Sequence, residues 1–179
     1  RNIKYIKIRE PGGSINSEKI RKLILDKKSN FNKNTDLLLY LAARSENINL
    51  LKKNYKKKII LIDRFIDSTI AYQHYGLGVN IDLIKTINKS LLKNFRVDFT
   101  FLNIVNKTNM MKRLKSRKTL NRYDSFNTNF YKRVQNGFLS LYRSNKKYYQ
   151  IIDSNLDKRE NKQQKIKKKD KLIWQIKKQ

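Results

Sequence analysis

The groups best placed for chemistry stand at the end of a short apolar segment. Residues 59–62 are apolar without alternation, and Asp63 and Arg64 follow them directly. Such a run is typical of a strand covered on both faces by helices. Ligands of open α/β sheets bind at the carboxyl ends of the strands, and a guanidinium fork matches pairs of anionic oxygens. The sequence therefore predicts a functional role for both residues, against the alternatives of a helix cap for Asp63 and a surface ion pair for Arg64.

A second pair of candidates lies on a predicted helix. Tyr40 and Arg44 are four residues apart, and positions with this spacing share one face of a helix, so both can line one pocket. The alternative is core packing for Tyr40 and solvent exposure for Arg44. The sequence has no cysteine, which excludes disulfides, thiolate metal sites and thiol nucleophiles. We assign no catalytic role to His74, the only histidine.

The elements that must position these residues alternate along the chain. The strand at residues 3–8 is stopped by Pro11 and a glycine pair. Asn34 and Thr35 are capping candidates for the second helix. Strands are expected at 3–8, 58–62, 99–105 and 149–152, and helices around 20–24, 38–51, 81–92, 108–115 and 126–148. Strands that alternate with helices predict an α/β protein with a parallel sheet.

Composition narrows the function classes. The net charge of +29 over 179 residues suits a polyanion partner, so a basic nucleic-acid-binding protein is one open alternative. The lysines are scattered among many asparagines and isoleucines, which indicates solvated surface and only non-specific electrostatic attraction to nucleic acid. No apolar stretch reaches the roughly 20 residues of a membrane span, and no secretory h-region opens the sequence. We expect a cytoplasmic protein without a membrane partner.

Four segments in order resemble the thymidylate kinase (dTMP kinase) family of bacterial type. The segments are Arg9-Glu10-Pro11-Gly12-Gly13, Leu39-Tyr40-Leu41-Ala42-Ala43-Arg44, Asp63-Arg64-Phe65 followed by Ser68, Ala71, Tyr72 and Gln73, and Asn121-Arg122-Tyr123-Asp124. The resemblance covers nearly all of the chain up to Asp153. It implies a P-loop nucleoside monophosphate kinase-like three-layer sandwich with a parallel sheet, whose central first strand is missing here.

The resemblance implies transfer of the γ-phosphoryl group of ATP to dTMP, giving dTDP and ADP, with Mg²⁺ as cofactor. Such a reaction depends on positioned cations more than on a nucleophilic side chain. Arg64 matches the arginine that binds the dTMP phosphate, and Asp63 matches the aspartate near magnesium, held directly or through water. The implied dTMP site comprises Glu10, Pro11, Tyr40, Arg44, Arg64, Ser68, Thr69, Tyr72 and Gln73.

A mobile lid over ATP is implied for residues 113–124. Arg117 matches a lid arginine that reaches the phosphates and joins Asp63 and Arg64 as a catalytic candidate, and Arg113 and Arg122 are further lid candidates on the ATP side. On the sugar or metal side the candidates are Asn121, Tyr123 and Asp124. Asn121 stands where the family usually has aspartate, and Phe126 stands where a second acidic residue is common.

One family motif is absent from this sequence. None of the five glycines is followed by lysine, so the phosphate-binding loop G-x-x-x-x-G-K-S/T does not occur. We interpret the chain as N-terminally truncated and expect it not to hold ATP by itself. The predicted domains are a thymidylate kinase-like domain at 1–156 and a basic C-terminal helix or tail at 157–179. A homodimer is implied by the family, and a non-catalytic relic or a related deoxynucleoside kinase of the same fold stays open.

Overall fold

The computed structural model describes residues 4–156, 159–160, 162–163 and 166. The chain divides into two compact units, each built from two separate stretches. The first unit contains residues 1–96 and 119–143, and the second contains residues 97–118 and 144–179. The predicted division into residues 1–156 and 157–179 stays a prediction, and of the basic segment only residues 159–160, 162–163 and 166 are described, all as helix.

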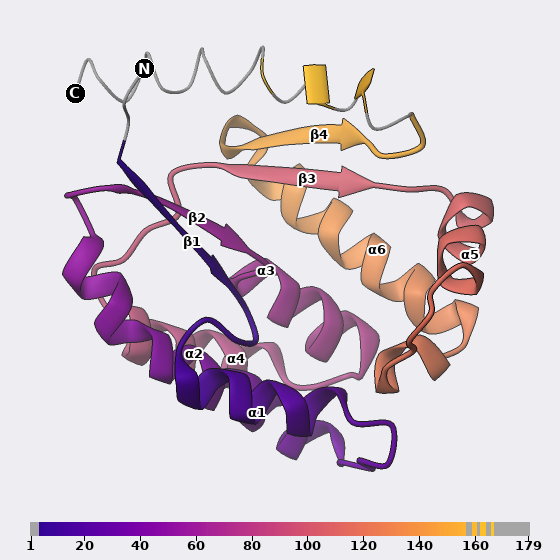
Figure 1. Cartoon of the computed structure of the whole chain (residues 1–179), viewed down its shortest axis with the longest axis horizontal. Helices are drawn as coiled ribbons and strands as arrows, with labels where there is room; N and C mark the ends of the chain where they lie inside the picture. The colour runs from indigo at the N-terminus through magenta and orange to yellow at the C-terminus, as the bar shows by residue number, and fades with distance from the viewer. Residues whose placement is uncertain (1–3, 157–158, 161, 164–165, 167–179) are drawn as a thin grey trace. The chain divides into compact units, whose positions relative to one another are not determined.

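A parallel strand pair forms the sheet of the first unit (Figure 1). Strand β1 runs over Tyr5–Arg9 and β2 over Ile59–Asp63, in a register that places Arg9 opposite Asp63. Both predicted strands are present, with shifted bounds. The strand predicted at 3–8 runs from residue 5 to 9, with residue 3 outside the described residues, and the strand predicted at 58–62 runs from 59 to Asp63 itself. The amide of Glu10 donates to the carbonyl of Asp63 at 2.9 Å, so β1 and β2 end at the same edge of the sheet.

The helices of the first unit are α1 (Ile15–Leu25), α2 (Lys33–Asn54), α3 (Ile66–Thr69), the π-helix η1 (Ile70–Gly76), α4 (Ile81–Leu92), the short 3₁₀-helix η2 (Arg122–Ser125) and α6 (Thr128–Ser144). The expected caps of α2 were wrong. Asn32 is the N-cap, and its side chain accepts from the amides of Asn34 and Thr35. The helix begins before the predicted caps because Asn32 offers the same capping chemistry at an earlier position.

Three apolar clusters hold the first unit together. Ile8 of β1 packs with Ile48 and Leu51 of α2 and with Leu92 of α4. A second cluster lies where α2 meets η1 and α4, and a third where α1 and η1 meet the buried aromatic face of α6. Helix α6 ends at Ser144, before the predicted limit of 148, and the chain then makes a 3₁₀ turn, η3, at Lys146–Tyr148.

The second unit carries another parallel pair, β3 (Thr100–Ile104) and β4 (Tyr149–Asp153), with helix α5 (Lys107–Lys115). The predicted strands at 99–105 and 149–152 and the helix at 108–115 are confirmed to within one residue at each end. Asn106 caps α5, and the side-chain oxygen of Asn155 accepts from the amide of Asn106 at 2.9 Å. Within the described part of the chain, no helix is long and apolar enough to cross a membrane.

Candidate functional site

A small pocket of the first unit gathers residues from five elements. Its lining comes from the end of β1, from α2, from the turn after β2, and from α3 and η1. The lining residues are Glu10, Tyr40, Arg44, Arg64, Phe65, Ser68, Thr69, Tyr72 and Gln73. Every residue predicted for the dTMP site lines this pocket except Pro11, which is buried next to it. Phe65 is the lining residue that the sequence did not single out as a candidate.

The side chains themselves fill most of this pocket. Its remaining volume is about 10 Å³, which is close to the space of a single water molecule. The guanidinium of Arg64 lies 4.6 Å from the centre of the Tyr72 ring and donates to the Tyr72 hydroxyl at 2.8 Å. A nucleotide can therefore enter only if side chains such as Arg64 move.

Arg44 is the most heavily bonded residue of the pocket. It is 1% exposed, so the alternative of solvent exposure was wrong. Its guanidinium donates to Glu10 at 2.8 Å, to Thr69 at 3.0 Å and to Asn88, and it lies 4.9 Å from the ring centre of Phe65. Burial raises the pKa of Glu10, and the charge of Arg44 opposes that rise.

The turn after β1 holds Glu10 in this position. Gly12 and Gly13 have φ angles of 123° and 106°, which side-chain-bearing residues rarely adopt. The buried Asn47 side chain donates to the Gly12 carbonyl at 2.8 Å, and the hydroxyl of Ser17 both accepts from and donates to the Gly12 backbone. The glycine pair and its two polar partners therefore fix the chain where it enters the pocket.

The chain leaves β2 in an unusual backbone conformation. Arg64 has a φ angle of 64°, in the left-handed region that costs a non-glycine residue roughly 1–2 kcal/mol, and such residues gather at functional sites. Asp63 is exposed beside it at the carboxyl end of the strand.

Among the described residues no group of three potential ligands for a metal is present. A single exposed carboxylate nevertheless fits Mg²⁺ that arrives with nucleotide phosphates, since this ion keeps several waters and needs few protein ligands.

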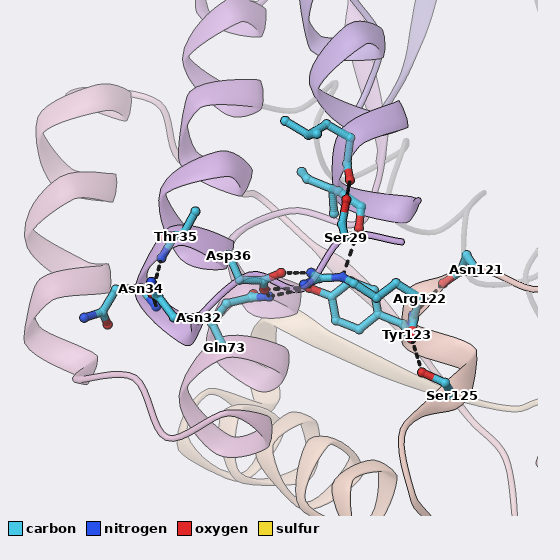
Figure 2. A network of polar contacts seen from close by, with 12 residues as sticks. Ser29, Asn32, Asn34, Thr35, Asp36, Gln73, Asn121, Arg122, Tyr123 and Ser125 are labelled. Atoms are coloured by element: carbon cyan, nitrogen blue, oxygen red, sulfur yellow. Dashed lines mark hydrogen bonds and ion pairs between the residues drawn. The ribbon is translucent and has the colours of Figure 1, made fainter. Parts of the chain in front are cut away.

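Gln73 connects the pocket to a buried polar network (Figure 2). Asp36 is fully buried in the first turn of α2 and pairs with Arg122 of η2. Its second oxygen accepts from Gln73 at 2.9 Å and from the Tyr123 hydroxyl at 2.6 Å. The guanidinium of Arg122 also donates to the carbonyl of Ile24 at 3.1 Å. Arg122 is thus held inside the first unit, and Tyr123 lies beside the residues of the pocket.

The remaining predicted lid residues lie in both units. Arg113 and Arg117 belong to the second unit, where the Arg113 guanidinium donates to the carbonyl of Ser154. Asn121 and Asp124 belong to the first unit and bond to each other, because the Asp124 carboxylate accepts from both nitrogens of Asn121. Their roles toward ATP, sugar and metal stay predictions.

The sequence did not point to Asp36, Asn47 or Asn88 as parts of the site. All three are buried polar residues on helices whose other buried side chains are mostly apolar. The sequence did offer one sign of this network. Each of these polar residues stands where the helical period predicts an apolar one, and a polar residue is buried there only with a hydrogen-bond partner.

Parallel strands with a pocket at their carboxyl ends, lined here by Arg44 and Arg64 among others, are typical of α/β proteins that bind ligands at this edge. A family model described as thymidylate kinase matches residues 1–166. The chain is 37% identical over 161 residues to a thymidylate kinase of Mycoplasma capricolum subsp. capricolum, covering 87% of this chain and 76% of that protein. It is 37% identical over 156 residues to one of Finegoldia magna, with 86% and 76% covered.

Among solved structures, the thymidylate kinase from Ehrlichia chaffeensis matches with a TM-score of 0.65 and 31% identity, covering 86% of this chain and 73% of that one. The chain belongs to the thymidylate kinase family. The predicted α/β fold class of P-loop kinase type is confirmed by this match and by the parallel strand pairs.

Proposed function

We propose that this chain binds dTMP as the phosphoryl acceptor of a dTMP kinase, an enzyme that transfers the γ-phosphoryl group of ATP to the phosphate of dTMP and yields dTDP and ADP. The observation that carries the proposal is the pocket of the first unit. The chain belongs to the thymidylate kinase family. In it, this pocket brings together eight of the nine residues that the resemblance assigned to dTMP, the exception being Pro11.

Arg64 is the proposed ligand of the dTMP phosphate. It exchanges its hydrogen bond to Tyr72 for the phosphate oxygens, and its guanidinium is not deprotonated at any working pH. The vacated ring of Tyr72 then offers an apolar face to the deoxyribose. The same movement of Arg64 opens the pocket and brings its guanidinium to the phosphate of the acceptor. A nucleoside has no phosphate to draw Arg64 away from Tyr72, so the exchange favours a phosphorylated acceptor.

The base lies among Tyr40, Ser68, Thr69 and Gln73 in this proposal. Tyr40 stacks on the thymine ring, and the hydroxyl and amide groups hydrogen-bond its edge. Arg44 holds its three bonds in the pocket wall and keeps Thr69 and Glu10 in place. A pocket that pairs polar edges discriminates strongly against bases that lack the matching groups.

Asp63 would hold Mg²⁺, directly or through water, and the ion supplies charge neutralisation between the phosphates when it is bound. Three arginines are proposed for the ATP side of the site, namely Arg113, Arg117 and Arg122, and Arg117 is the one proposed to reach the phosphates. The candidates proposed for the sugar or metal side are Asn121, Tyr123 and Asp124. The 179-residue sequence contains no phosphate-binding loop, so no residue of this chain is assigned to ATP beyond these. A cytoplasmic homodimer is a further proposal that follows from the family.

The test is a coupled ADP-release assay on the protein expressed from its complete coding sequence, with dTMP, dUMP, dCMP and thymidine as acceptors. We expect dTMP to be preferred and thymidine to be inert. Turnover of thymidine would favour a deoxynucleoside kinase, and equal rates with all monophosphates would refute the proposed specificity.

A further inference from the structure

The carboxylate of Asp36 receives hydrogen bonds from three different side chains. Arg122 donates to one of its oxygens, and Gln73 and Tyr123 donate to the other. An ionised carboxylate can only accept hydrogen bonds. Each group that faces Asp36 must therefore present a donor to it.

This requirement fixes the orientation of the Gln73 carboxamide. Its nitrogen faces Asp36 at 2.9 Å and the Tyr123 hydroxyl at 3.2 Å, so its carbonyl oxygen points the other way. That oxygen is buried and has no hydrogen-bond partner among the described residues. Gln73 also lines the pocket proposed for dTMP. A buried carbonyl without a partner is costly, and a donor on a bound ligand removes the cost.

We propose that Asp36 is a positioning residue that holds the Gln73 carbonyl toward the acceptor base and thereby selects a base with a ring N–H donor. This inference rests on the proposed function. The thymine ring carries a hydrogen at N3, whereas the cytosine ring has a bare acceptor nitrogen at the same position. A carbonyl held in one orientation bonds the first and repels the second, and a carboxamide free to turn would serve both.

Arg122 has a different part in the same network. A fully buried carboxylate needs a counter-charge to stay ionised, and the guanidinium of Arg122 supplies it while lying against the rings of Phe31 and Tyr123. Among the described residues Arg122 makes no hydrogen bond to Gln73. A lysine at position 122 would keep the counter-charge and weaken the pair without giving Gln73 a new donor to face. Arg122 therefore offers a matched control for Asp36.

The experiment measures kcat/KM for dTMP and for dCMP with the protein expressed from its complete coding sequence. In Asp36→Asn, the new amide can either accept from Gln73 or donate to it, so both orientations of Gln73 become available. We expect the ratio of kcat/KM for dTMP over dCMP to fall by at least about tenfold, the size of one lost buried hydrogen bond. Part of that fall should appear as a gain of activity with dCMP.

The control is Arg122→Lys, which keeps the counter-charge of Asp36 but loses the guanidinium fork. It should lower thermal stability and leave the dTMP to dCMP ratio within about threefold of the wild type, because an ionised carboxylate still faces Gln73. If Asp36→Asn does not fold, Asp36→Ser carries the same expectation, since a hydroxyl also donates and accepts.

An unchanged ratio in a folded Asp36 variant overturns the inference, and so does an equal fall in Arg122→Lys, which would indicate general loosening of the pocket. These outcomes differ from failure of the proposed function, in which the wild-type protein itself shows no preference for dTMP.

Discussion

Replacing Arg44 with methionine removes one partner of the buried ion pair with Glu10. Arg44 and Glu10 are 1% and 5% exposed, so water cannot take the place of the lost guanidinium. Methionine fills similar volume without charge, while Glu10 keeps two buried oxygens, one of which already has no partner among the described residues. The carboxylate is then left in the protein interior without its counter-charge.

The expected cost is about 3–5 kcal/mol, which is typical when one member of a buried ion pair is removed. The double variant Glu10→Gln with Arg44→Met should recover at least about 1 kcal/mol of that loss, because a neutral amide is far cheaper to bury than a carboxylate. The double variant is therefore predicted to be more stable than the single one, although it departs further from the natural sequence. Urea unfolding monitored by circular dichroism measures both differences.

The pH dependence gives an independent check on the same carboxylate. Burial raises the pKa of Glu10 above its ordinary value of 4.5, so in that range the folded state binds more protons than the unfolded state. The free energy of unfolding must then fall as pH rises from about 4.5 through the raised pKa. Arg44 limits the rise, so Arg44→Met should show a steeper fall that reaches higher pH, and the double variant should lose the extra slope.

Two results would refute this reasoning. One is a double variant that is no more stable than Arg44→Met. The other is an identical pH dependence for the single and double variants. Either would mean that Glu10 is solvated or repartnered when Arg44 is absent, and the buried cluster would not be the feature that holds Glu10 in the pocket wall.

Four further substitutions test other features of the first unit. Arg64→Lys keeps the charge but loses the planar fork, so dTMP should bind about tenfold more weakly in calorimetric titration, with unfolding free energy changed by less than about 1 kcal/mol. Gly76→Ala would place a Cβ atom 2.6 Å from the Phe130 ring and should cost about 1–3 kcal/mol. Asn32→Ala should cost about 1 kcal/mol through loss of the α2 cap. Asn34→Ala, at the wrongly predicted cap, should change stability by less than about 0.5 kcal/mol, and matched thermal melts would contradict the capping assignment if both variants behaved alike.

The parts of the fold that follow from local patterns were predictable. The strands and the helices predicted at 81–92 and 108–115 agree with the structure to within two residues, because apolar runs and helical periods are written in consecutive residues. The helices predicted around 20–24, 38–51 and 126–148 exist, but their bounds are 15–25, 33–54 and 128–144. The cap of α2 was misplaced because Asn32, Asn34 and Thr35 all have capping chemistry, and only the backbone conformation distinguishes them.

The grouping of the pocket residues was predictable only through the family motifs, and its polar support was not. Asp36 meets Arg122 from 86 positions away and Arg44 meets Asn88 from 44 positions away. No pattern of neighbouring residues encodes such pairs, since they depend on how helices pack. The π-helix η1 was missed for the same reason, because its wide turn is stabilised by contacts with α6 and α2 and not by any local motif.

The wide turn of η1 makes the number of residues in this segment as important as their identity. The amide of Leu77 bonds to the carbonyl of Tyr72, five positions back, at 3.0 Å, where an α-helix would use the fourth. Tyr72 and Gln73 therefore owe their directions to one additional residue in the turn. A point substitution at a half-buried position of η1 leaves that count intact, whereas deletion of a single residue lets the segment relax to an α-helix and turns the following side chains by about 100°. We expect natural variants of this protein to differ by substitution within residues 70–76 and to conserve the length of the segment.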